Sequence, residues 1–512
     1  QKLHITDDYM INDVFNSDFI PATIGGESLY GYPMRTVISE SNNTNWDKAV
    51  LAMANVNIPY TYEKSLSLPY NVLHTDLKWS TNTEDKKRAS KYIESILLML
   101  RTKVLLNNGD LSKTEIVWFY PASMTQNRFN KFKAEWENTF ATLFGAPISN
   151  IIAASESVAP YYYHKAKKGA TSTVVSVDIG GGTTDVLIVD KGEPKYLTSF
   201  RFAANTIFGD GYSYDSDSNG FVNKYKDIIT NQLETNNLRG LKAVLKSVLD
   251  KRVSTDVIAF LFSLASNKEI KKEKVEINFA KMLADDNRGK YVVILFYVAI
   301  VYHIAKLMKA KGFDMPRHMT FSGNGSKVLN ILSTNDATLV RLTKIIFEEI
   351  YAQSYSIDGL DIIRPANSKE STCKGGIILT PFQSQDYGEI KDMKTILIGT
   401  DNEKFADVHM TYNDVTEADL DSVVDVIKEY IEFTFKLDKK FSFYDNFDVD
   451  RSIMNKVKDL CYRDIRTYLE NGLAIKKSEI AQDGADDNLE ETLFFYPLVG
   501  IINAVVRNIY QM

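Results

Sequence analysis

The chain has 512 residues but only two cysteines, Cys373 and Cys461, which lie far apart in the sequence. Two such cysteines provide neither a disulfide framework nor a thiolate metal site, so proteins that depend on either are excluded. This scarcity fits a reducing compartment, and we expect a cytoplasmic protein. The six histidines are scattered and form no HExxH pattern, which argues against a histidine-based metal centre.

Long apolar runs and an excess of basic residues are also lacking. The most apolar segment, 292–304, is interrupted by Tyr297, Tyr302 and His303, and it falls short of the roughly 18 apolar residues that a membrane helix needs. We expect it to be a buried core helix. The formal net charge is −6, so no chain-wide positive field draws the protein to nucleic acid. We therefore expect neither a membrane nor nucleic acid as a partner.

The length and the apolar patterning predict a large α/β protein. Single cores stop growing at about 250–300 residues, so a chain of this length should form two large lobes. Strands are indicated by short apolar runs between turn residues. These runs are 114–120, 148–153, 174–177, 186–189, 195–202, 394–398 and one that ends at 320–324. Helical spacing of apolar residues appears in 84–106, 124–143, most of 215–310, 416–435 and 452–470.

The most informative segment is VDIGGGTTD, residues 177–185, in which three glycines separate two apolar strands. Glycines there cost backbone entropy and pack no side chain, so they need another purpose. A glycine turn allows close approach to a ligand and presents N–H groups that bind an anion. Asp178 suits a Mg²⁺ ion that keeps most of its waters, and Thr183 and Thr184 add hydroxyl donors. A plain hairpin turn would not explain the acidic residues on both sides.

This segment resembles the second phosphate loop of the actin / heat-shock chaperone / sugar kinase superfamily. That loop reads Asp-x-Gly-Gly-Gly-Thr-x-Asp, and every position from Asp178 to Asp185 matches. The resemblance implies a two-lobed actin-like (ribonuclease H-like) α/β ATPase fold, with extra helices at the C-terminus. It is nearest to the ATPase domain of the seventy-kilodalton heat-shock chaperones. It also implies that Gly180, Gly181, Gly182, Thr183 and Thr184 bind phosphates, and that Asp178 and Asp185 hold Mg²⁺ through water.

Other segments are similar to parts of this family in the expected order. ASESVA, residues 154–159, is similar to the chaperones' connecting segment Asn-Glu-Pro-Thr-Ala-Ala, which implies that Glu156 lies near the attacking water. Residues 119–123 resemble the strand end before it. The Gly-Gly turn of the chaperones has a counterpart in 208–211, which implies phosphate contacts from Gly209 and Asp210. Residues 321–327 resemble the adenosine motif, which implies contacts from Gly323, Asn324, Gly325, Ser326 and Lys327.

Two further matches are shorter. Residues 372–377 are similar to the second connecting segment, where Gly375 and Gly376 would let two helices cross at a hinge. Cys373 would then be a small buried residue. Lys78 lies in a setting similar to that of the chaperones' catalytic lysine, although a plain surface lysine explains it equally simply.

The resemblance divides the chain into a first lobe at 1–172, a second lobe at 173–365 with a helical subdomain at about 215–310, and a region at 366–512. That last region would cross the hinge and pack its helices back on the first lobe. The first phosphate loop of the family is missing. Since residues 35–38 resemble the strand that follows it, we expect the loop to lie before Gln1. The alternative is a degenerate site. No peptide-binding domain follows residue 380, so a peptide-refolding chaperone is not supported.

The function implied is binding of ATP and ADP with Mg²⁺, with slow hydrolysis that drives lobe closure in a chaperone-like or actin-like switch protein. Catalysis would depend on Glu156, Asp178 and Lys78. Three alternatives stay open: an ATP-dependent actin-like filament protein, a small-molecule kinase, and a catalytically degenerate scaffold of the same fold. A protein partner or self-assembly is expected in addition to the nucleotide.

Overall fold

The computed structural model describes residues 34–41, 51–57, 71–74, 77, 80, 82–121, 124, 126–156, 158–168, 173–356, 359–365, 368–378, 410–483, 489 and 491–512. Its largest sheet has five strands in the order β10-β9-β6-β7-β8. Strands β6 (Val174–Ile179), β7 (Thr184–Asp190) and β8 (Glu193–Phe200) form an antiparallel meander, as the glycine-punctuated sequence predicts. Strands β9 (His318–Ser322) and β10 (Asp361–Ile363) continue the sheet in parallel from β6.

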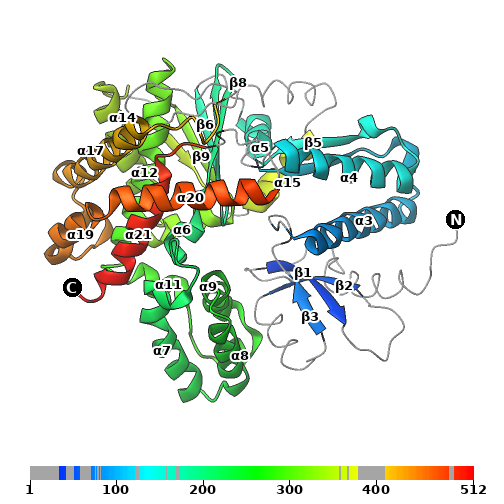
Figure 1. Cartoon of the computed structure of the whole chain (residues 1–512), viewed down its shortest axis with the longest axis horizontal. Helices are drawn as coiled ribbons and strands as arrows, with labels where there is room; N and C mark the ends of the chain where they lie inside the picture. The colour runs from blue at the N-terminus through cyan, green and yellow to red at the C-terminus, as the bar shows by residue number, and fades with distance from the viewer. Residues whose placement is uncertain are drawn as a thin grey trace.

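Each face of this sheet packs against a different part of the molecule, because successive side chains of a strand point to opposite faces. On one face Val175, Val177 and Ile179 join the large core formed with the helix α12 (Lys290–Ala310). On the other face Val174 joins a smaller core with α5 (Val158–Lys168). Figure 1 shows the sheet between these two groups of helices.

Helix α12 (Lys290–Ala310) forms the centre of the large core. Among the described residues it is the one helix long and apolar enough to cross a membrane, but 94% of its most apolar window is buried inside the molecule. The expectation that 292–304 is a core helix is therefore confirmed.

A group of shorter helices extends from one end of the part of the molecule that contains the five-strand sheet (Figure 1). They are α7 (Gly220–Thr235), α8 (Arg239–Asp250), α9 (Ser254–Ser263), α10 (Lys268–Lys272) and α11 (Phe279–Ala284). The sequence predicted a helical subdomain at about 215–310, and this is too long at its C-terminal end. Helix α12 lies against the sheet, because it is apolar around its whole circumference and needs burial on every side.

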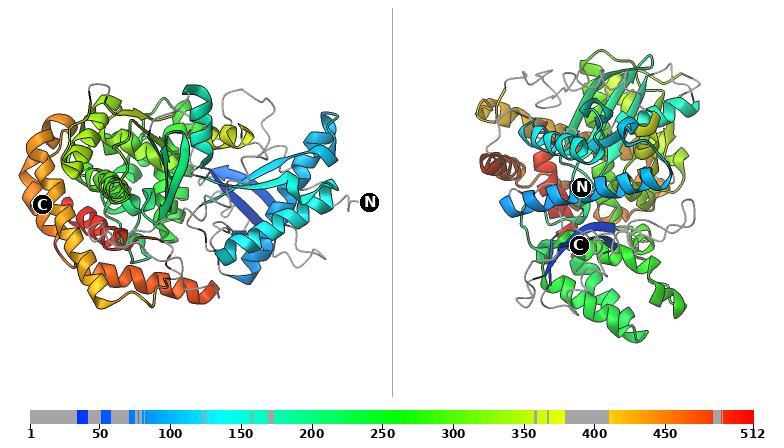
Figure 2. Two further views of the ribbon diagram at one scale, coloured as in Figure 1. Left: turned by 90° about the horizontal axis from the view of Figure 1, so that it is seen from above. Right: turned by 90° about the vertical axis from the view of Figure 1, so that its right-hand side faces the viewer.

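The C-terminal helices form an outer layer on the second lobe (Figure 2). Helices α17 (Glu417–Phe441), α19 (Met454–Cys461), α20 (Ile465–Asp483) and α21 (Phe495–Ile509) share their core with α12 and α14 (Asp336–Tyr351). The prediction that these helices pack back on the first lobe is therefore corrected. These helices bury their apolar side chains against α12. Because the contacting segments are far apart in the sequence, no local pattern indicates this packing. The strand expected at 394–398 lies outside the described residues.

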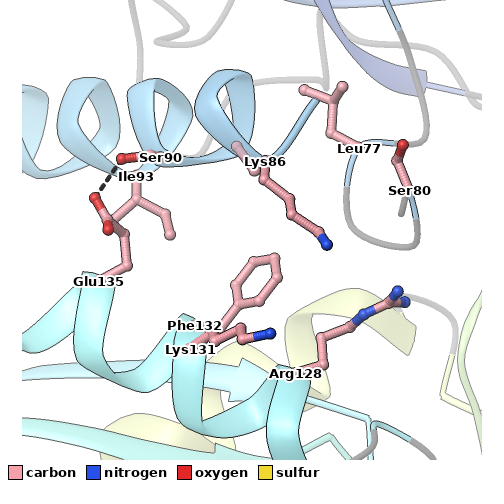
Figure 3. A pocket seen from close by; sticks show the side chains of 10 residues that line it. Leu77, Ser80, Lys86, Ser90, Ile93, Arg128, Lys131, Phe132 and Glu135 are labelled. Atoms are coloured by element: carbon pink, nitrogen blue, oxygen red, sulfur yellow. Dashed lines mark hydrogen bonds between the residues drawn. The ribbon is translucent and has the colours of Figure 1, made fainter. Parts of the chain in front are cut away.

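The described residues between 34 and 156 form two small sheets and two long helices. Strands β1 (Met34–Ser41), β2 (Leu51–Asn57) and β3 (Asn71–His74) form one sheet, and β4 (Ile116–Tyr120) pairs in parallel with β5 (Ile151–Ser155) in the other. Helices α3 (Thr83–Leu106) and α4 (Gln126–Phe144) pack with these two strands in a core that contains Trp118 and Phe140. A cavity of about 160 Å³ opens between the two helices (Figure 3).

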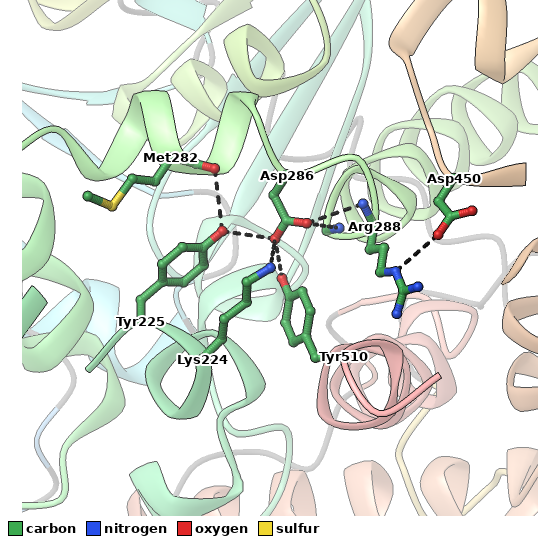
Figure 4. A network of polar contacts seen from close by, with 8 residues as sticks. Lys224, Tyr225, Met282, Asp286, Arg288, Asp450 and Tyr510 are labelled. Carbon is green, nitrogen blue, oxygen red and sulfur yellow. Dashed lines mark hydrogen bonds and ion pairs between the residues drawn. The ribbon is translucent and has the colours of Figure 1, made fainter. Parts of the chain in front are cut away.

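The buried carboxylate of Asp286 connects Tyr510, directly after α21, with Tyr225 of α7 (Figure 4). Asp286 accepts hydrogen bonds from the hydroxyls of Tyr225 and Tyr510, at 2.9 and 2.6 Å, and it pairs with Lys224 at 3.1 Å. The backbone N–H groups of Arg288 and Gly289 also donate to it. Burial acts to raise the pKa of Asp286, but these hydrogen bonds and the Lys224 charge hold the pKa below its ordinary value.

Candidate glycine-loop site

The predicted phosphate loop is a tight turn between β6 and β7. The N–H of Gly180 donates to the carbonyl of Thr183 at 2.8 Å, which closes the turn, and the carbonyl of Gly181 accepts from the N–H of Asn205 at 2.8 Å. Gly181 and Gly182 are exposed. Within the described part of the chain, the N–H groups of these two glycines donate to no protein acceptor. They are therefore available to an anion, as a nest of amides requires.

The predicted adenosine turn packs directly against this loop. A Cβ atom on Gly323 would lie 2.2 Å from the carbonyl oxygen of Ile179 and 2.5 Å from Oδ1 of Asp178, and one on Gly325 would lie 2.1 Å from the carbonyl oxygen of Gly180. Gly323 also has a φ of +78°, which favours glycine. Two glycine turns from strands far apart in the sequence thus meet backbone to backbone.

The other residues of the adenosine turn have different surroundings. The hydroxyl of Ser326 is buried and donates to the carbonyl of Gly323 at 2.7 Å, so it closes the turn. Asn324 is partly exposed and Lys327 is exposed. These last two are the side chains of the turn that reach the surface.

The two predicted metal-binding carboxylates are paired across the strands β6 and β7. Asp178 is directly opposite Asp185, so their side chains lie on the same face of the sheet, and they are 8% and 1% exposed. The hydroxyl of Ser322, the partner of Asp178 on β9, donates to Oδ2 of Asp178 at 2.9 Å. Among the described residues there is no group of three or more His, Cys, Asp or Glu side chains suited to a metal. The carboxylate pair therefore suits an ion that keeps most of its waters.

Three predicted phosphate-binding residues are engaged with the protein. The hydroxyl of Thr184 is fully buried and donates to the carbonyl of Phe202 at 2.6 Å, so it would have to leave this bond to reach a phosphate. Gly209 ends the short helix α6 (Ala204–Phe208). Asp210 accepts a hydrogen bond from Ser254 at 2.8 Å, at the start of α9. The turn at Gly209 and Asp210 is therefore linked to the helical group.

Glu156 lies on the α5 side of the sheet, as the two carboxylates do. It follows β5, and its N–H donates to the carbonyl of Tyr120 at 2.9 Å. Its neighbours Ala154 and Val158 belong to the core that covers this face of β6 and β7. The structure thus brings Glu156 to the side of the sheet where Asp178 and Asp185 project. Lys78 lies outside the described residues.

The predicted hinge glycines lie where α15 (Ser368–Ile378) crosses α5. A Cβ on Gly375 would lie 1.8 Å from the carbonyl oxygen of Ala159, and one on Gly376 would lie 2.4 Å from the ring of Phe119. Glycine is therefore required for this close crossing, while the hinge role stays a prediction. The expectation that Cys373 is buried is wrong, because the glycines form the contact face of α15 and Cys373 points to solvent.

Two polar contacts near the loop were not predicted. Ser322 lies next to Asp178 because β9 pairs in parallel with β6, and its position just before the glycine of the predicted adenosine turn is the one sequence signal for this contact. The backbone N–H of Arg201, directly after β8, donates to the buried Glu491 at 2.6 Å. No sequence signal joins residues so far apart along the chain.

No protein-family model matches the chain, and no curated protein is detectably similar in sequence. Solved structures that resemble it include MreB5 of Spiroplasma citri bound to ADP, at 12% identity and a TM-score of 0.32, with 69% of this chain and 90% of that chain covered. The same protein bound to AMPPNP gives 13% identity and a TM-score of 0.30, covering 70% and 90%.

A third similar structure is the ethanolamine utilization protein EutJ from Carboxydothermus hydrogenoformans. It shares 11% identity with a TM-score of 0.30, and 73% of this chain and 98% of that chain are covered. Similarities at this level do not establish a common fold. The functional argument therefore depends on the glycine loops and the carboxylates themselves.

Proposed function

We propose that the chain binds a purine nucleotide, ATP before others, across the two glycine turns. The observation that carries this proposal is the backbone contact between Gly323–Gly325 and Ile179–Gly180, with Asp178 at the junction. A side chain at Gly323 or Gly325 would clash with the backbone of the first turn, so glycine is required on this side of the contact. Such an arrangement lets one ligand touch both turns, with its phosphates on the exposed N–H groups of Gly181 and Gly182.

The strand order supports the actin-like form of the fold. In the ribonuclease H-like sheet, an antiparallel three-strand meander is extended by parallel strands beside its first strand. Strands β6 to β10 have this order. On this proposal, the five-strand sheet is the core of the second lobe of a two-lobed ATPase.

The predicted residues that lie around the two turns then have defined tasks. Gly180, Gly181, Gly182 and Thr183 hold the phosphates, while Gly323, Asn324, Gly325 and Lys327 lie along the adenosine. Asp178, with Asp185 behind it, would hold Mg²⁺ through water, and the ion would neutralise charge on the phosphates. Glu156 would orient the attacking water from the α5 side.

We further propose slow hydrolysis coupled to lobe movement in a cytoplasmic switch protein. The crossing of α5 and α15 joins Glu156 to the glycine pair at 375–376, so a change at the nucleotide would move both helices together. Which protein senses this movement, or whether copies of the chain assemble, would be established by sedimentation with and without nucleotide.

The test is a calorimetric titration with MgATP, MgADP and MgGTP. Gly181→Asp should abolish binding, because it places a carboxylate among the phosphate-binding N–H groups. Gly181→Ala is the matched control: its Cβ would meet only the Asn205 side chain at ordinary contact distances, from 3.6 Å. Binding of ATP that is equal in the Gly181→Ala and Gly181→Asp variants, or no binding by the unchanged chain, would overturn the proposal.

Asp178→Asn gives a second test of the same site. Asparagine keeps an oxygen that can accept from Ser322 but removes the charge. We expect loss of the Mg²⁺ dependence of nucleotide binding with the fold retained, as measured by circular dichroism. Unchanged Mg²⁺ dependence would exclude Asp178 as the residue that holds the ion.

A further inference from the structure

The side chain of Asn205 lies beside the exposed part of the glycine loop. A Cβ atom on Gly181 would lie 3.6 Å from Oδ1 of Asn205 and 3.7 Å from its Nδ2, so the side-chain amide is next to Gly181. Asn205 is exposed, and within the described part of the chain its side-chain amide makes no hydrogen bond. The amide therefore offers two N–H donors and an acceptor to a ligand bound at the loop.

The backbone of Asn205 is held in place by the loop itself. Its N–H donates to the carbonyl of Gly181 at 2.8 Å, and the N–H of Ala204 donates to the carbonyl of Gly180 at 3.3 Å. At the other end of α6, a Cβ on Gly209 would lie 2.2 Å from the carbonyl oxygen of Asn205. Because these contacts fix the backbone, little conformational freedom is left to lose when the side chain meets a ligand.

The order of contacts along the loop indicates which part of a nucleotide reaches Asn205. The predicted adenosine turn packs against Ile179 and Gly180, whereas the Asn205 side chain lies beside Gly181, the next residue. A nucleotide whose ribose lies at the adenosine turn would extend its phosphates from Gly180 towards Gly181 and Gly182. The phosphate furthest from the adenosine would then be the one within reach of the Asn205 amide.

An amide at this place distinguishes a triphosphate from a diphosphate. A hydrogen bond to a charged phosphate oxygen is stronger than one between neutral groups, so its loss is measurable. A diphosphate has no terminal phosphate at this position, and the amide would stay hydrated. Only the triphosphate gains from the contact.

We propose that Asn205 donates a hydrogen bond to the terminal phosphate of the bound nucleotide and makes the site prefer ATP to ADP. This inference rests on the proposed function, because it concerns the same nucleotide site. It adds a residue from α6 to a phosphate site otherwise formed by the loop between β6 and β7.

The test is a calorimetric titration of MgATP and MgADP into the full chain and into Asn205→Ala. The variant should raise the dissociation constant for MgATP about tenfold or more, as the loss of a hydrogen bond to a charged group does. The dissociation constant for MgADP should change less than twofold. Asn205→Asp should weaken MgATP binding more than Asn205→Ala does, because its carboxylate repels the phosphate.

Asn471→Ala is the matched control, because Asn471 is an exposed asparagine of α20 whose side chain also makes no hydrogen bond within the described residues. It should leave both dissociation constants unchanged. The melting temperature without nucleotide should be the same in all variants, since Asn205 is exposed.

Two results would overturn the inference while the proposed nucleotide site stands. One is an equal loss of MgATP and MgADP affinity in Asn205→Ala, which would indicate a structural role. The other is an unchanged affinity for MgATP in that variant. If the unchanged chain binds neither nucleotide, the proposed function fails and this inference fails with it.

Discussion

Asp178 and Asp185 are directly paired residues of the antiparallel strands β6 and β7, and both are buried. Like charges in this position destabilise a sheet by a few tenths of a kcal/mol to about 1 kcal/mol. A cation close to the pair reverses the sign of this contribution.

We therefore predict that millimolar Mg²⁺ raises the melting temperature of the chain in the presence of ADP. At 100 times its dissociation constant, a ligand that binds only the folded state adds about 2.7 kcal/mol. Asp178→Asn and Asp185→Asn should each remove most of the increase in melting temperature that Mg²⁺ causes. Asp227→Asn, an exposed position on α7, is the control and should keep it. An equal increment in all variants would assign the ion to another site.

Gly323 and Gly312 form a matched pair for measuring the contact between the two loops. Both have positive φ, +78° and +72°, but only at Gly323 would a Cβ meet other atoms within 4 Å. Gly312→Ala should cost about 1 kcal/mol, for the backbone conformation alone. Gly323→Ala should cost a further 1–3 kcal/mol for overpacking and weaken nucleotide binding. The free energy of unfolding is measured in urea. Equal losses in Gly323→Ala and Gly312→Ala would show that the two glycine turns are not in close contact.

Gly375→Ala tests the crossing of α5 and α15. The new methyl group would lie 1.8 Å from the backbone of Ala159, so the helices must move apart. We predict a loss of about 3 kcal/mol in the free energy of unfolding, at the upper end of overpacking costs. Cys373→Ala, on the exposed side of the same helix, should change it by less than about 0.5 kcal/mol. A neutral Gly375→Ala would contradict the close crossing.

The parts of the fold and of the candidate site that could be predicted from the sequence are those specified by residues close together in the chain. The meander β6–β8 and its glycine loop were predicted, because alternating apolar residues and clustered glycines act over a few positions. The same holds for α3, whose N-cap Asn82 and apolar spacing define it locally. The pairing of Asp178 with Asp185 follows from the loop length between the two strands.

The features that the sequence did not predict depend on contacts between segments that are far apart along the chain. The C-terminal helices were placed on the wrong lobe, because α17 and α21 are amphipathic or apolar in a way that fits any partner. Cys373 was predicted to be buried because its glycine neighbours were, although a shift of two residues turns a helical position to the opposite face.

His303 should make the fold sensitive to acid. Its ring is fully buried between Phe200, Phe494 and Phe495, and neither nitrogen has a hydrogen-bond partner. Burial lowers the pKa of His303 to about 3, whereas the unfolded chain takes up this proton near pH 6.5. The stabilisation by the neutral ring is complete above pH 6.5 and is lost as the pH falls from 6.5 towards 3.

The measurement is the free energy of unfolding at pH 7 and pH 5 for the unchanged chain and for His303→Leu. The unchanged chain should lose roughly 2 kcal/mol more than the variant over this interval, since one proton contributes about 1.4 kcal/mol per pH unit. A packing change caused by His303→Leu alters the free energy of unfolding equally at both pH values. It therefore does not affect the difference between pH 7 and pH 5, which is the quantity compared. Parallel pH dependences would show that His303 is accessible to protons in the folded state.

Tyr510→Phe tests the attachment of the last helix. It removes the 2.6 Å hydrogen bond to Asp286 while the ring stays in place. Hydrogen bonds to charged groups contribute about 1.5–3 kcal/mol, and we expect a loss in the lower half of that range because Tyr225 and Lys224 remain. Tyr444→Phe, at an exposed tyrosine, should be neutral. Guanidinium unfolding of the three proteins would decide between these outcomes.

The burial of α12 also affects how the chain is made. During synthesis this helix emerges well before α17 and α21, the segments that later cover it. At about 5–20 residues per second, α12 waits roughly 10 to 40 s for its C-terminal partner. For that time the part of the α12 surface that α17 and α21 cover in the folded protein has no partner. A chain that is interrupted before α21 would therefore leave this apolar surface of α12 uncovered and would be prone to aggregate.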